Sequence, residues 1–492
     1  MNNLKNKLAP FVLSYLRFFA KLQLKKNSQA KIIGITGSAG KTSCQSAVLA
    51  ALGKNKARFK IKVSHKANSE SGIPLDILGL RVKNYSPLDW LRLLLLAPWQ
   101  LLTNWQQFDL YIIEMGIDSP LPPKNMDYLL SIVQPQIAII LNAKAIHSAN
   151  FDQLLNETEQ KQREQNETEQ KQREQAVIRL IAAEKSKLAQ ALPSSGLAII
   201  NRDDPAIWEC SRQTQAEILT FGTAGGDAEH ELDLKLIDWQ VNLAGSHFIF
   251  EIRNHLKKYN SGSRLLELNL KNLVLGKHYS AALASAILLA FKLGLKKNEI
   301  KNNLEKYWTL EPGRSSLLVG KNNSYLLDSS YNASGMLEMI ELTQQLISND
   351  QHIKRALAII GDIRELGAET QAIHQEVAQA LAESFSEVYL VGPLMENYAL
   401  PILQDKIKNG AGQIKQVKTY LDSQSAGKDL AKNLAAGDLV LVKGSQNTIF
   451  LEEAVALLLA EEKSAKKVLC RQSEYWLKLK NTVAKQSEDQ TK

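Results

Sequence analysis

The sequence predicts an α/β protein with successive domains, each organised around a mostly parallel sheet. Short apolar runs rich in β-branched residues alternate along the chain with helical segments, which is the pattern of parallel strands joined by helices. This alternation stops near residues 307–314, where Pro312 and Gly313 break it, and then begins again. The 492 residues also exceed what one hydrophobic core normally organises, so more than one domain is expected.

The composition limits the kinds of function. Hydrophobic residues make up 45% and charged residues 23% of the chain, as in an ordinary soluble enzyme. The net charge of +9 suits anionic ligands, but no aromatic and basic side chains interleave as they do where bases stack, which argues against nucleic acid as a partner. Cys44, Cys210 and Cys470 form no metal-binding spacing and suit a reducing, cytoplasmic location.

Residues 1–30 are predicted to form an amphipathic helical segment. Arg17 and Lys21 interrupt its apolar run, which also lacks a small-residue cleavage site, so a signal peptide and a membrane span are both disfavoured. A second apolar stretch, 90–102, is too short to span a membrane and is expected to be broken by Pro98. Packing on the first domain is the favoured interpretation for both stretches, and weak peripheral membrane contact is the alternative.

A phosphate-binding loop is predicted where the strand 31–36 gives way to a helix that begins at Ser43 and stops at Gly53. Glycine lets the backbone approach phosphate oxygens closely, and a helix N-terminus favours an anion. Lys41 would supply a charge for the β- and γ-phosphates and Thr42 a hydroxyl for Mg²⁺. The residues expected to hold ATP here are Gly37, Ser38, Ala39, Gly40, Lys41, Thr42 and Ser43.

The loop matches only the second half of the strict P-loop pattern, because Ile35 stands where the first glycine is required. The alternative is a plain glycine turn that happens to contain a lysine. The strand before the loop and the helix after it favour nucleotide binding.

Two further strands are predicted to end near this loop. The run 108–116 is apolar until it reaches Glu114, and the run 136–143 ends just before His147. Ligands of open parallel sheets gather at the carboxyl ends of the strands, so Glu114 is expected to reach the site defined by Lys41 and Thr42.

The rest of this domain, 31–307, continues with helices and strands. The polar unit 156–165 is repeated unchanged as 166–175, which predicts an exposed helical duplication without chemistry. The helix continues over 176–192, and Lys185 would lie on its surface if the sequence pattern alone decided. The alternating segment 231–275 predicts a few antiparallel strands at one edge of the domain.

A smaller, doubly wound (Rossmann-like) domain is predicted over 308–466. Its strand segments are expected at 324–330, 355–367, 387–392 and 438–446, and it has no phosphate loop of its own. Residues 467–492 are charged and are predicted to form a tail that frays.

The order of these motifs resembles the Mur ligase family, the ATP-dependent amide ligases of peptidoglycan precursor synthesis. The resemblance covers roughly residues 31–459, and its later motifs are most similar to the branch that adds D-alanyl-D-alanine to UDP-N-acetylmuramoyl-tripeptide. The motifs are GITGSAGKTS, YIIEMG, LNAKAIH, EKSKL, IINRDD, LVLGKH, LEPGR, DSSYNAS, AIIGDIRELG and LVKGSQ.

The resemblance implies metal and phosphate roles for residues of the first domain. Thr42 and Glu114 would hold one Mg²⁺, and His147 would bind a second. Lys185 matches the lysine that the family carbamylates, which turns a cation into a carboxylate-like Mg²⁺ ligand. From the residues alone, His147 would be a loop histidine in water.

The resemblance also implies roles beyond the metal site. Arg314 would contact the ATP phosphates and Asp328 the ribose side, with Asn332 beside them. Substrate contacts are implied for Asn68, Glu70 and Gly72 on the nucleotide-sugar side and for Lys443, Gly444 and Ser445 on the amine side. Ser69 departs from the family pattern, and residues 1–30 are shorter than the usual UDP-sugar domain, so the contact with UDP is left unassigned.

The implied reaction is acyl activation. A substrate carboxylate would attack the γ-phosphate of ATP, and the amine of a second substrate would then displace phosphate. The expected partners are UDP-N-acetylmuramoyl-peptide and D-alanyl-D-alanine, with the protein acting as a monomer. Two alternatives remain: the same chemistry on another acid and amine, as in folylpolyglutamate or amino-acid-polymer ligases, and a P-loop module that uses ATP only as a switch.

Overall fold

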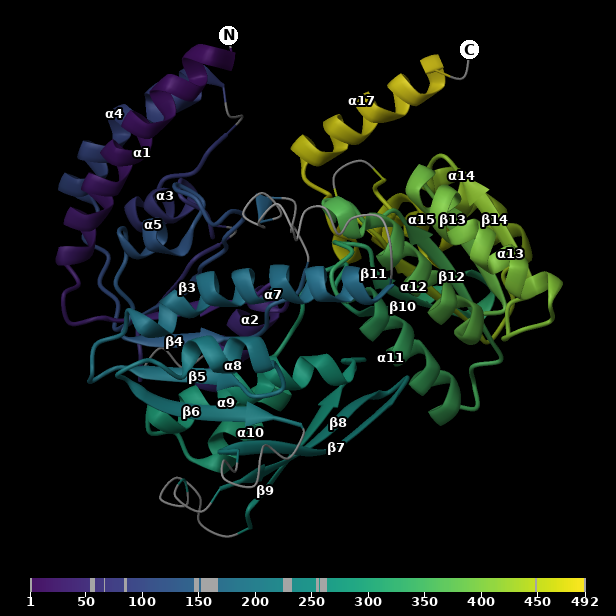
Figure 1. The fold of residues 1–492 in the computed structure, drawn as a ribbon, viewed down its shortest axis with the longest axis horizontal. Helices are drawn as coiled ribbons and strands as arrows, with labels where there is room; N and C mark the ends of the chain where they lie inside the picture. The colour runs from purple at the N-terminus through teal and green to yellow at the C-terminus, as the bar shows by residue number, and fades with distance from the viewer. Residues whose placement is uncertain are drawn as a thin grey trace. The chain divides into compact units, whose positions relative to one another are not determined.

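The chain divides into two compact units in the computed structural model (Figure 1). The structure describes residues 2–53, 58–65, 67–83, 86–145, 150–151, 167–223, 232–253, 256, 263–446 and 449–490. The first unit contains residues 1–237, 250–266 and 280–308, and the second contains 238–249, 267–279 and 309–492.

The first unit is organised around parallel strands in the order β2-β3-β1-β4-β5-β6, which confirms the predicted α/β class. The central strand β1 pairs with β3 on one side and with β4 on the other. Its side chains are buried after the first residue because helices cover both faces. The strands are β1 (Lys31–Thr36), β2 (Ile61–Val63), β3 (Leu110–Glu114), β4 (Ile137–Ile140), β5 (Leu197–Asn201) and β6 (Glu217–Gly222).

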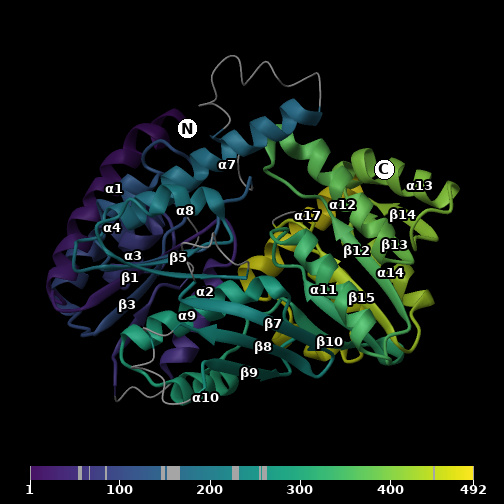
Figure 2. The same ribbon diagram turned by 60° about the horizontal axis from the view of Figure 1, so that its bottom comes forward.

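Helices lie on both sides of this sheet. Helices α7 and α8 pack with alternate residues of β3, β4 and β5 such as Tyr111, Ala138 and Ile200, while α2 packs on α9 (Figure 2). The helices are α2 (Lys41–Leu52), α5 (Met126–Leu130), α7 (Glu167–Gln190), α8 (Pro205–Ser211), α9 (Ser280–Lys292) and α10 (Lys297–Tyr307). Most of the predicted duplication, 156–166, lies outside the described residues, and 167–175 form the start of α7.

Three strands follow β6 in the sheet order, as the alternating segment 231–275 predicts. They are β7 (Leu234–Asn242), β8 (Gly245–Ile252) and β9 (Leu265–Lys271). Only two residues join β7 to β8, a connection that antiparallel neighbours alone permit. Burial alternates along β8 and β9, as expected for strands with one solvated face.

The N-terminal segment is a helix packed on the first unit, as predicted. Helix α1 (Asn2–Lys25) lies beside α4 (Pro87–Thr103), and both pack on α3 (Gly72–Leu78). The expected break at Pro98 is wrong, because α4 continues past this residue to Thr103. No helix of the described residues is both long and apolar enough to cross a membrane.

The second unit has its own six-stranded sheet in the order β10-β11-β15-β12-β13-β14. All of its pairings are parallel except that of β10 with β11. The sequence pattern predicted neither β10 nor β14, the two strands at the edges of this sheet. Its strands are β10 (Ser316–Gly320), β11 (Ser324–Ser329), β12 (Arg355–Gly361), β13 (Glu387–Val391), β14 (Gln416–Tyr420) and β15 (Asp438–Lys443). Its helices are α11 (Met336–Asn349), α12 (Thr370–Ser384), α13 (Leu400–Lys408), α14 (Ser423–Asn433), α15 (Glu452–Leu458), α16 (Ala465–Val468) and α17 (Glu474–Gln490).

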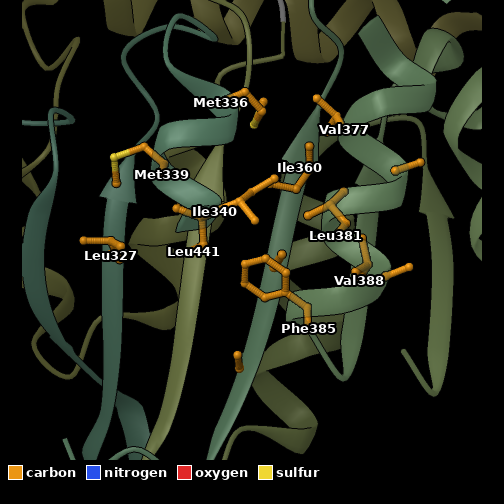
Figure 3. Packing of buried hydrophobic residues seen from close by; sticks show 14 of the residues in the cluster. Leu327, Met336, Met339, Ile340, Ile360, Val377, Leu381, Phe385, Val388 and Leu441 are labelled. Carbon is orange, nitrogen blue, oxygen red and sulfur yellow. The ribbon is translucent and has the colours of Figure 1, made fainter. Parts of the chain in front are cut away.

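The core on one face of this sheet is filled mainly by aliphatic side chains and methionines, and it includes the aromatic ring of Phe385. Figure 3 shows Ile340 of α11 and Leu381 of α12 facing Ile360 and Leu441 of the strands, with Phe385 below them. Phe385 is completely buried. This packing anchors α11 and α12, and therefore the segments that precede them, to the sheet.

The C-terminal tail is more ordered than its composition predicts. Lys480 of α17 is 7% exposed and forms ion pairs with Glu452 at 2.9 Å and Glu453 at 2.6 Å. Glu452 is fully buried and also binds Arg471, whose Nε donates to Glu452 Oε1 at 2.8 Å. A buried carboxylate requires cationic partners, and the tail supplies two of them.

Truncation of Phe385 tests how far the second core supports its unit. Phe385→Ala should lower the free energy of unfolding of the second unit by about 3–5 kcal/mol, because it leaves a cavity in a packed core. Urea unfolding followed by tryptophan fluorescence would measure this. The control is Leu421→Ala, since Leu421 is 75% exposed; equal effects of the two substitutions would contradict the assignment.

Candidate active site

The predicted phosphate loop lies between β1 and α2 and is held by the neighbouring strand. Asn142, just beyond β4, accepts a hydrogen bond from Ala39 N at its Oδ1 (2.9 Å) and donates from Nδ2 to Ala39 O (3.3 Å). Its main-chain oxygen accepts from Ser38 N at 3.0 Å. The sequence analysis did not select Asn142, although a polar residue at the carboxyl end of a buried strand was a usable signal.

Residues of the IINRDD segment in turn hold Asn142. Asn201 Nδ2 donates to Leu141 O at 2.8 Å, and Asp204 Oδ2 accepts from Ala143 N at 2.7 Å. The residues on both sides of Asn142 are therefore fixed, which positions its amide against the loop.

The loop requires glycine at positions 37 and 40 for two different structural reasons. Gly40 has φ of 84°, a left-handed conformation that L side chains rarely adopt. A Cβ on Gly37 would lie 2.9 Å from Leu141 Cβ, so the loop backbone approaches β4 too closely for a side chain. The first N–H groups of the 12-residue helix α2 point toward the loop, as at any helix N-terminus, and Gly40 supplies no side chain to cap them.

Lys41 lies folded over the loop, where its Nζ donates to Gly37 O at 2.6 Å. Thr42 and Ser43 follow in the first turn of α2. The predicted nucleotide residues thus form one continuous turn with a lysine, backbone N–H groups and a hydroxyl. These donors match the charge and shape of a polyphosphate.

Glu114 ends β3 at the same edge of the sheet. It is level with Ile35 in the β1–β3 register and is only 8% exposed. Its backbone N–H donates to Ser64 Oγ at 3.2 Å, and Thr36 Oγ1 donates to Met115 O at 2.8 Å. A buried carboxylate beside a phosphate loop has the oxygen chemistry that Mg²⁺ prefers.

Lys185 is buried in α7, and the placement on the helix surface that the pattern alone suggested is wrong. The side chain is only 3% exposed. Burial first, and then the charge of Lys41, hold the pKa of Lys185 well below its usual value, while Asp118 and Glu184 oppose this shift. The phosphate-loop lysine and Lys185 therefore lie within electrostatic reach of each other, a convergence that helical periodicity could not reveal.

Acidic side chains surround this lysine, and the sequence analysis selected none of them. Glu184 is buried, and its Oε1 accepts from Met126 N at 2.7 Å. Lys187 pairs with Glu184 at 2.7 Å and with Asp127 at 2.6 Å. The carboxylate of Glu184 is therefore held at the N-terminus of α5 by Met126 N and Lys187.

One predicted metal ligand cannot be compared with the structure. His147 lies outside the described residues, so the set Thr42, Glu114, His147 and Lys185 is described only in part. Among the residues that the structure does describe, no group of three histidine, cysteine or acidic side chains is arranged to hold a metal. The metal assignments remain predictions.

The segment predicted to bind the nucleotide-sugar side lies against the end of β3. Asn68 O accepts from Gly116 N at 2.9 Å, and a Cβ on Gly116 would be 3.2 Å from Asn68 Nδ2. Ser69 Oγ accepts from Gly72 N at 3.2 Å at the start of α3. Burial raises the pKa of Tyr128, and the charges of Arg17 and Glu70 act on it in opposite directions, so Glu70 is also near this edge.

The second unit brings together a separate group of predicted residues. Lys443, at the end of β15, is 2% exposed, and its Nζ donates to Asn332 O at 3.1 Å and Ser329 Oγ at 3.2 Å. Burial lowers the pKa of Lys443 to about 7, with smaller effects from Glu338, Arg314 and Asp328. The guanidinium of Arg314 lies 4.1 Å from the ring centre of Tyr331.

Asp328 is completely buried in this group. Its Oδ1 accepts from Ser330 N at 3.0 Å, and within the described part of the chain Oδ2 accepts no hydrogen bond. Burial raises the pKa of Asp328 to about 6, against the effect of the Ser330 hydrogen bonds. The side chain faces the protein interior, so any effect on a nucleotide would pass through its neighbours.

Gly444 and Ser445 connect β15 to the segment after β12. A Cβ on Gly444 would be 2.9 Å from Gly361 Cα, so the two backbones need a glycine at this contact. Ser445 Oγ accepts from Arg364 N at 2.8 Å, and Ser445 N donates to Asp362 O at 3.0 Å. The LVKGSQ and GDIRELG motifs, distant in the sequence, thus form one loop cluster.

Comparison with known proteins finds similar ligases. The family described as "Mur ligase, glutamate ligase domain" matches residues 313–446. A UDP-N-acetylmuramoyl-tripeptide–D-alanyl-D-alanine ligase of Synechocystis is 26% identical over 432 residues, which cover 87% of this chain and 75% of the relative. The enzyme of the same name from Escherichia coli is 24% identical over 441 residues, covering 88% and 78%.

Solved structures show the same fold. The MurF ligase of Thermotoga maritima in complex with ADP superposes with a TM-score of 0.67 at 20% identity, covering 92% of this chain and 84% of that one. A MurF structure from Acinetobacter baumannii gives a TM-score of 0.63 at 21% identity, covering 90% and 79%.

The role of Asn142 is open to direct measurement. Asn142→Ala removes both side-chain hydrogen bonds to Ala39 and should raise the Kd for ADP about tenfold, as expected when two modest hydrogen bonds that order a binding loop are lost. Isothermal titration calorimetry would measure the Kd for ADP of the variant and of the wild type. Asn409→Ala, an exposed amide in the second unit, is the control, and an unchanged Kd in the folded Asn142 variant would refute the role.

The buried amine of Lys443 predicts a pH-dependent stability. Its pKa is about 7 when folded and 10.5 when exposed, so between these values the unfolded chain binds more protons and stability rises with pH. The unfolding free energy of the wild type relative to Lys443→Met should therefore increase from pH 7 to 9, by at most about 1.4 kcal/mol per pH unit. Urea titrations at each pH would measure it, with the exposed Lys408→Met as control; a flat or falling difference would contradict the burial argument.

Proposed function

We propose that the chain is an ATP-dependent amide ligase of the Mur ligase family, acting in peptidoglycan precursor synthesis. It joins D-alanyl-D-alanine to UDP-N-acetylmuramoyl-tripeptide and releases ADP and phosphate. The names of the relatives supply the substrates. The observation that carries the proposal to this chain is the grouping of Lys41, Glu114 and buried Lys185 around one phosphate loop.

In the first step, a carboxylate oxygen of the tripeptide attacks the γ-phosphorus of ATP, and the bond to ADP breaks. Charge builds up on the transferring group and on the leaving ADP, so fixed positive charge and N–H donors lower the barrier. Lys41 and the backbone of residues 37–40 supply these donors. Asn142 keeps the loop in shape while this happens.

The metal requirement fits the side chains present. Thr42 and Glu114 offer a hydroxyl and a carboxylate, both hard oxygen ligands, beside the loop. When bound there, Mg²⁺ would neutralise phosphate charge and orient the γ-phosphate. His147 keeps its predicted role in a second site.

Lys185 is proposed to act as a carbamate. Burial and the charge of Lys41 favour its neutral form, which has the lone pair needed to attack carbon dioxide. The nitrogen forms a bond to carbon, one proton leaves, and the product carries a negative charge in place of a positive one. This exchange would replace repulsion by attraction toward Lys41 and would supply an oxygen ligand within electrostatic reach of the phosphate-loop lysine.

In the second step, the amine of D-alanyl-D-alanine attacks the acyl carbon, the bond to phosphate breaks, and the nitrogen loses a proton. The proposed substrate residues are Asn68, Glu70 and Gly72 in the first unit and Lys443, Gly444 and Ser445 in the second. Arg314, Asp328 and Asn332 keep their predicted roles toward ATP. The protein is proposed to act as a monomer in the cytoplasm, where ATP is supplied and its three free cysteines remain reduced.

Phosphate release from ATP tests the proposed activity. With Mg²⁺ and bicarbonate, release should require both UDP-N-acetylmuramoyl-tripeptide and D-alanyl-D-alanine, and mass spectrometry should find the pentapeptide product. Release with a folate and glutamate instead would favour the alternative ligase chemistry. Phosphate release that requires neither of the two substrates would favour a P-loop module that uses ATP only as a switch.

Substitution of Lys185 tests whether this residue acts as a carbamate or has a purely structural role. Lys185→Ala should lower kcat by about 10²-fold or more, as expected when a group that stabilises transition-state charge is lost. Arg179→Ala, an exposed position of the same helix, should leave kcat unchanged. Full activity of Lys185→Ala, or wild-type activity that is indifferent to the removal of bicarbonate, would disprove the carbamate.

A further inference from the structure

Helices α1 and α4 form a pair with a small core of their own. Leu16 of α1 and Leu93 and Ala97 of α4 are fully buried, and they pack on residues of α3. The hydroxyl of Tyr15 donates to Leu94 O at 3.1 Å, which joins the two helices at their seam. Figures 1 and 2 show α1 and α4 side by side within the first unit.

The outer face of α4 is a continuous apolar stripe that this core does not use. Its members recur at intervals of three or four residues, so they lie along one side of the helix. Each of them is more than half exposed: Leu88, Leu91, Leu95, Trp99 and Leu102. A stripe of this length in a folded unit indicates a binding surface, because single exposed apolar residues are common but contiguous rows are not.

Helix α1 adds aromatic side chains beside the seam. Phe11 and Phe18 lie three or four residues on either side of Tyr15, on one flank of the helix, and are 75% and 58% exposed. Trp105, just past the end of α4, is 66% exposed, and Lys26 Nζ lies 4.1 Å from its ring centre. Phenylalanine and tryptophan next to lysine are typical of the interface between water and lipid.

The charges around this face indicate what kind of partner it binds. The sequence of α1, residues 2–25, contains no aspartate or glutamate, and Lys21 and Lys25 are exposed beside its aromatic flank. The one acidic residue of α4, Asp89, is buried, and its Oδ1 pairs with Arg92 at 2.7 Å. The face is therefore apolar with a basic rim, which complements anionic headgroups above a hydrocarbon layer.

A second copy of the chain is a poorer match. A symmetric contact between two copies would place the basic rim of one α1 against that of the other, and like charges oppose such contacts. Crossing of a bilayer is also inconsistent with the helices, because none in the described part of the chain is long and apolar enough.

We propose that the outer face of α1 and α4, with Trp105, binds peripherally to an anionic lipid surface. The apolar stripe and the aromatic side chains enter the headgroup region, and the lysines of α1 contact the lipid phosphates. This property is independent of the ligase chemistry, since none of these residues belongs to the candidate active site.

Co-sedimentation of the full chain with vesicles tests the proposal. The protein should bind vesicles of phosphatidylglycerol and phosphatidylcholine, bind pure phosphatidylcholine more weakly, and lose affinity as salt screens the lysines. The double variant Leu95→Gln/Trp99→Gln should bind the anionic vesicles about a hundredfold more weakly, since each side chain removed from lipid contact costs about tenfold. Lys21→Gln/Lys25→Gln should reduce the preference for anionic lipid.

The matched control replaces two exposed apolar residues elsewhere, Val319→Gln/Leu421→Gln, and should bind vesicles like the wild type. Circular dichroism and ATP-dependent phosphate release should be unchanged in all variants, which separates lost lipid contact from misfolding. Absence of vesicle binding by the wild type, or equal binding by the Leu95/Trp99 variant, would overturn the proposal. A change of oligomeric state in that variant without vesicle binding by the wild type would instead assign the face to a second copy.

Discussion

The parallel pairing of β1 with β3 and β4 is the constraint on which the first unit depends. It sets Ile35 level with Glu114 and Thr36 level with Ile140, so that three chain segments end at one edge of the sheet. A slip by one residue would turn each side chain to the opposite face and move Glu114 away from the loop. The loop, its carboxylate and the amide of Asn142 are therefore positioned by strand register before any side-chain interaction is counted.

Burial of charged groups near both sets of candidate residues is the second feature of this architecture. Lys185 in the first unit and Lys443 in the second are both nearly inaccessible, and burial lowers the pKa of each. Burying a lysine costs stability unless its charge is removed or paired, so such positions are rarely kept for packing alone. Glu452 illustrates the structural use of the same chemistry, since Arg471 and Lys480 neutralise it and fasten the C-terminal tail.

The phosphate loop and the α1–α4 face of the first unit suit two different kinds of anion. The phosphate loop presents a lysine and backbone N–H groups that converge on a compact charge. The pair α1 and α4 presents dispersed lysines beside an apolar face, which suits an extended and partly hydrocarbon surface. The net charge of +9 does not distinguish these uses. Only the placement of the cations relative to apolar or backbone groups does so.

The sequence by itself determined the class of the fold, the phosphate loop and the order of the motifs. These features are local: strands and helices have their own periodicities, and a glycine turn that ends in Lys41 and Thr42 needs only a strand before it and a helix after it. The edge strand β10 was missed because its short run has no strong pattern of its own and is stabilised by pairing with β11. Tertiary structure alone decided that Lys185 is buried next to the charge of Lys41, that Asn142 holds the loop, and that Lys443 contacts Asn332. These are contacts between residues about 100 or more positions apart, and their existence depends on how helices pack on sheets, which no local pattern encodes.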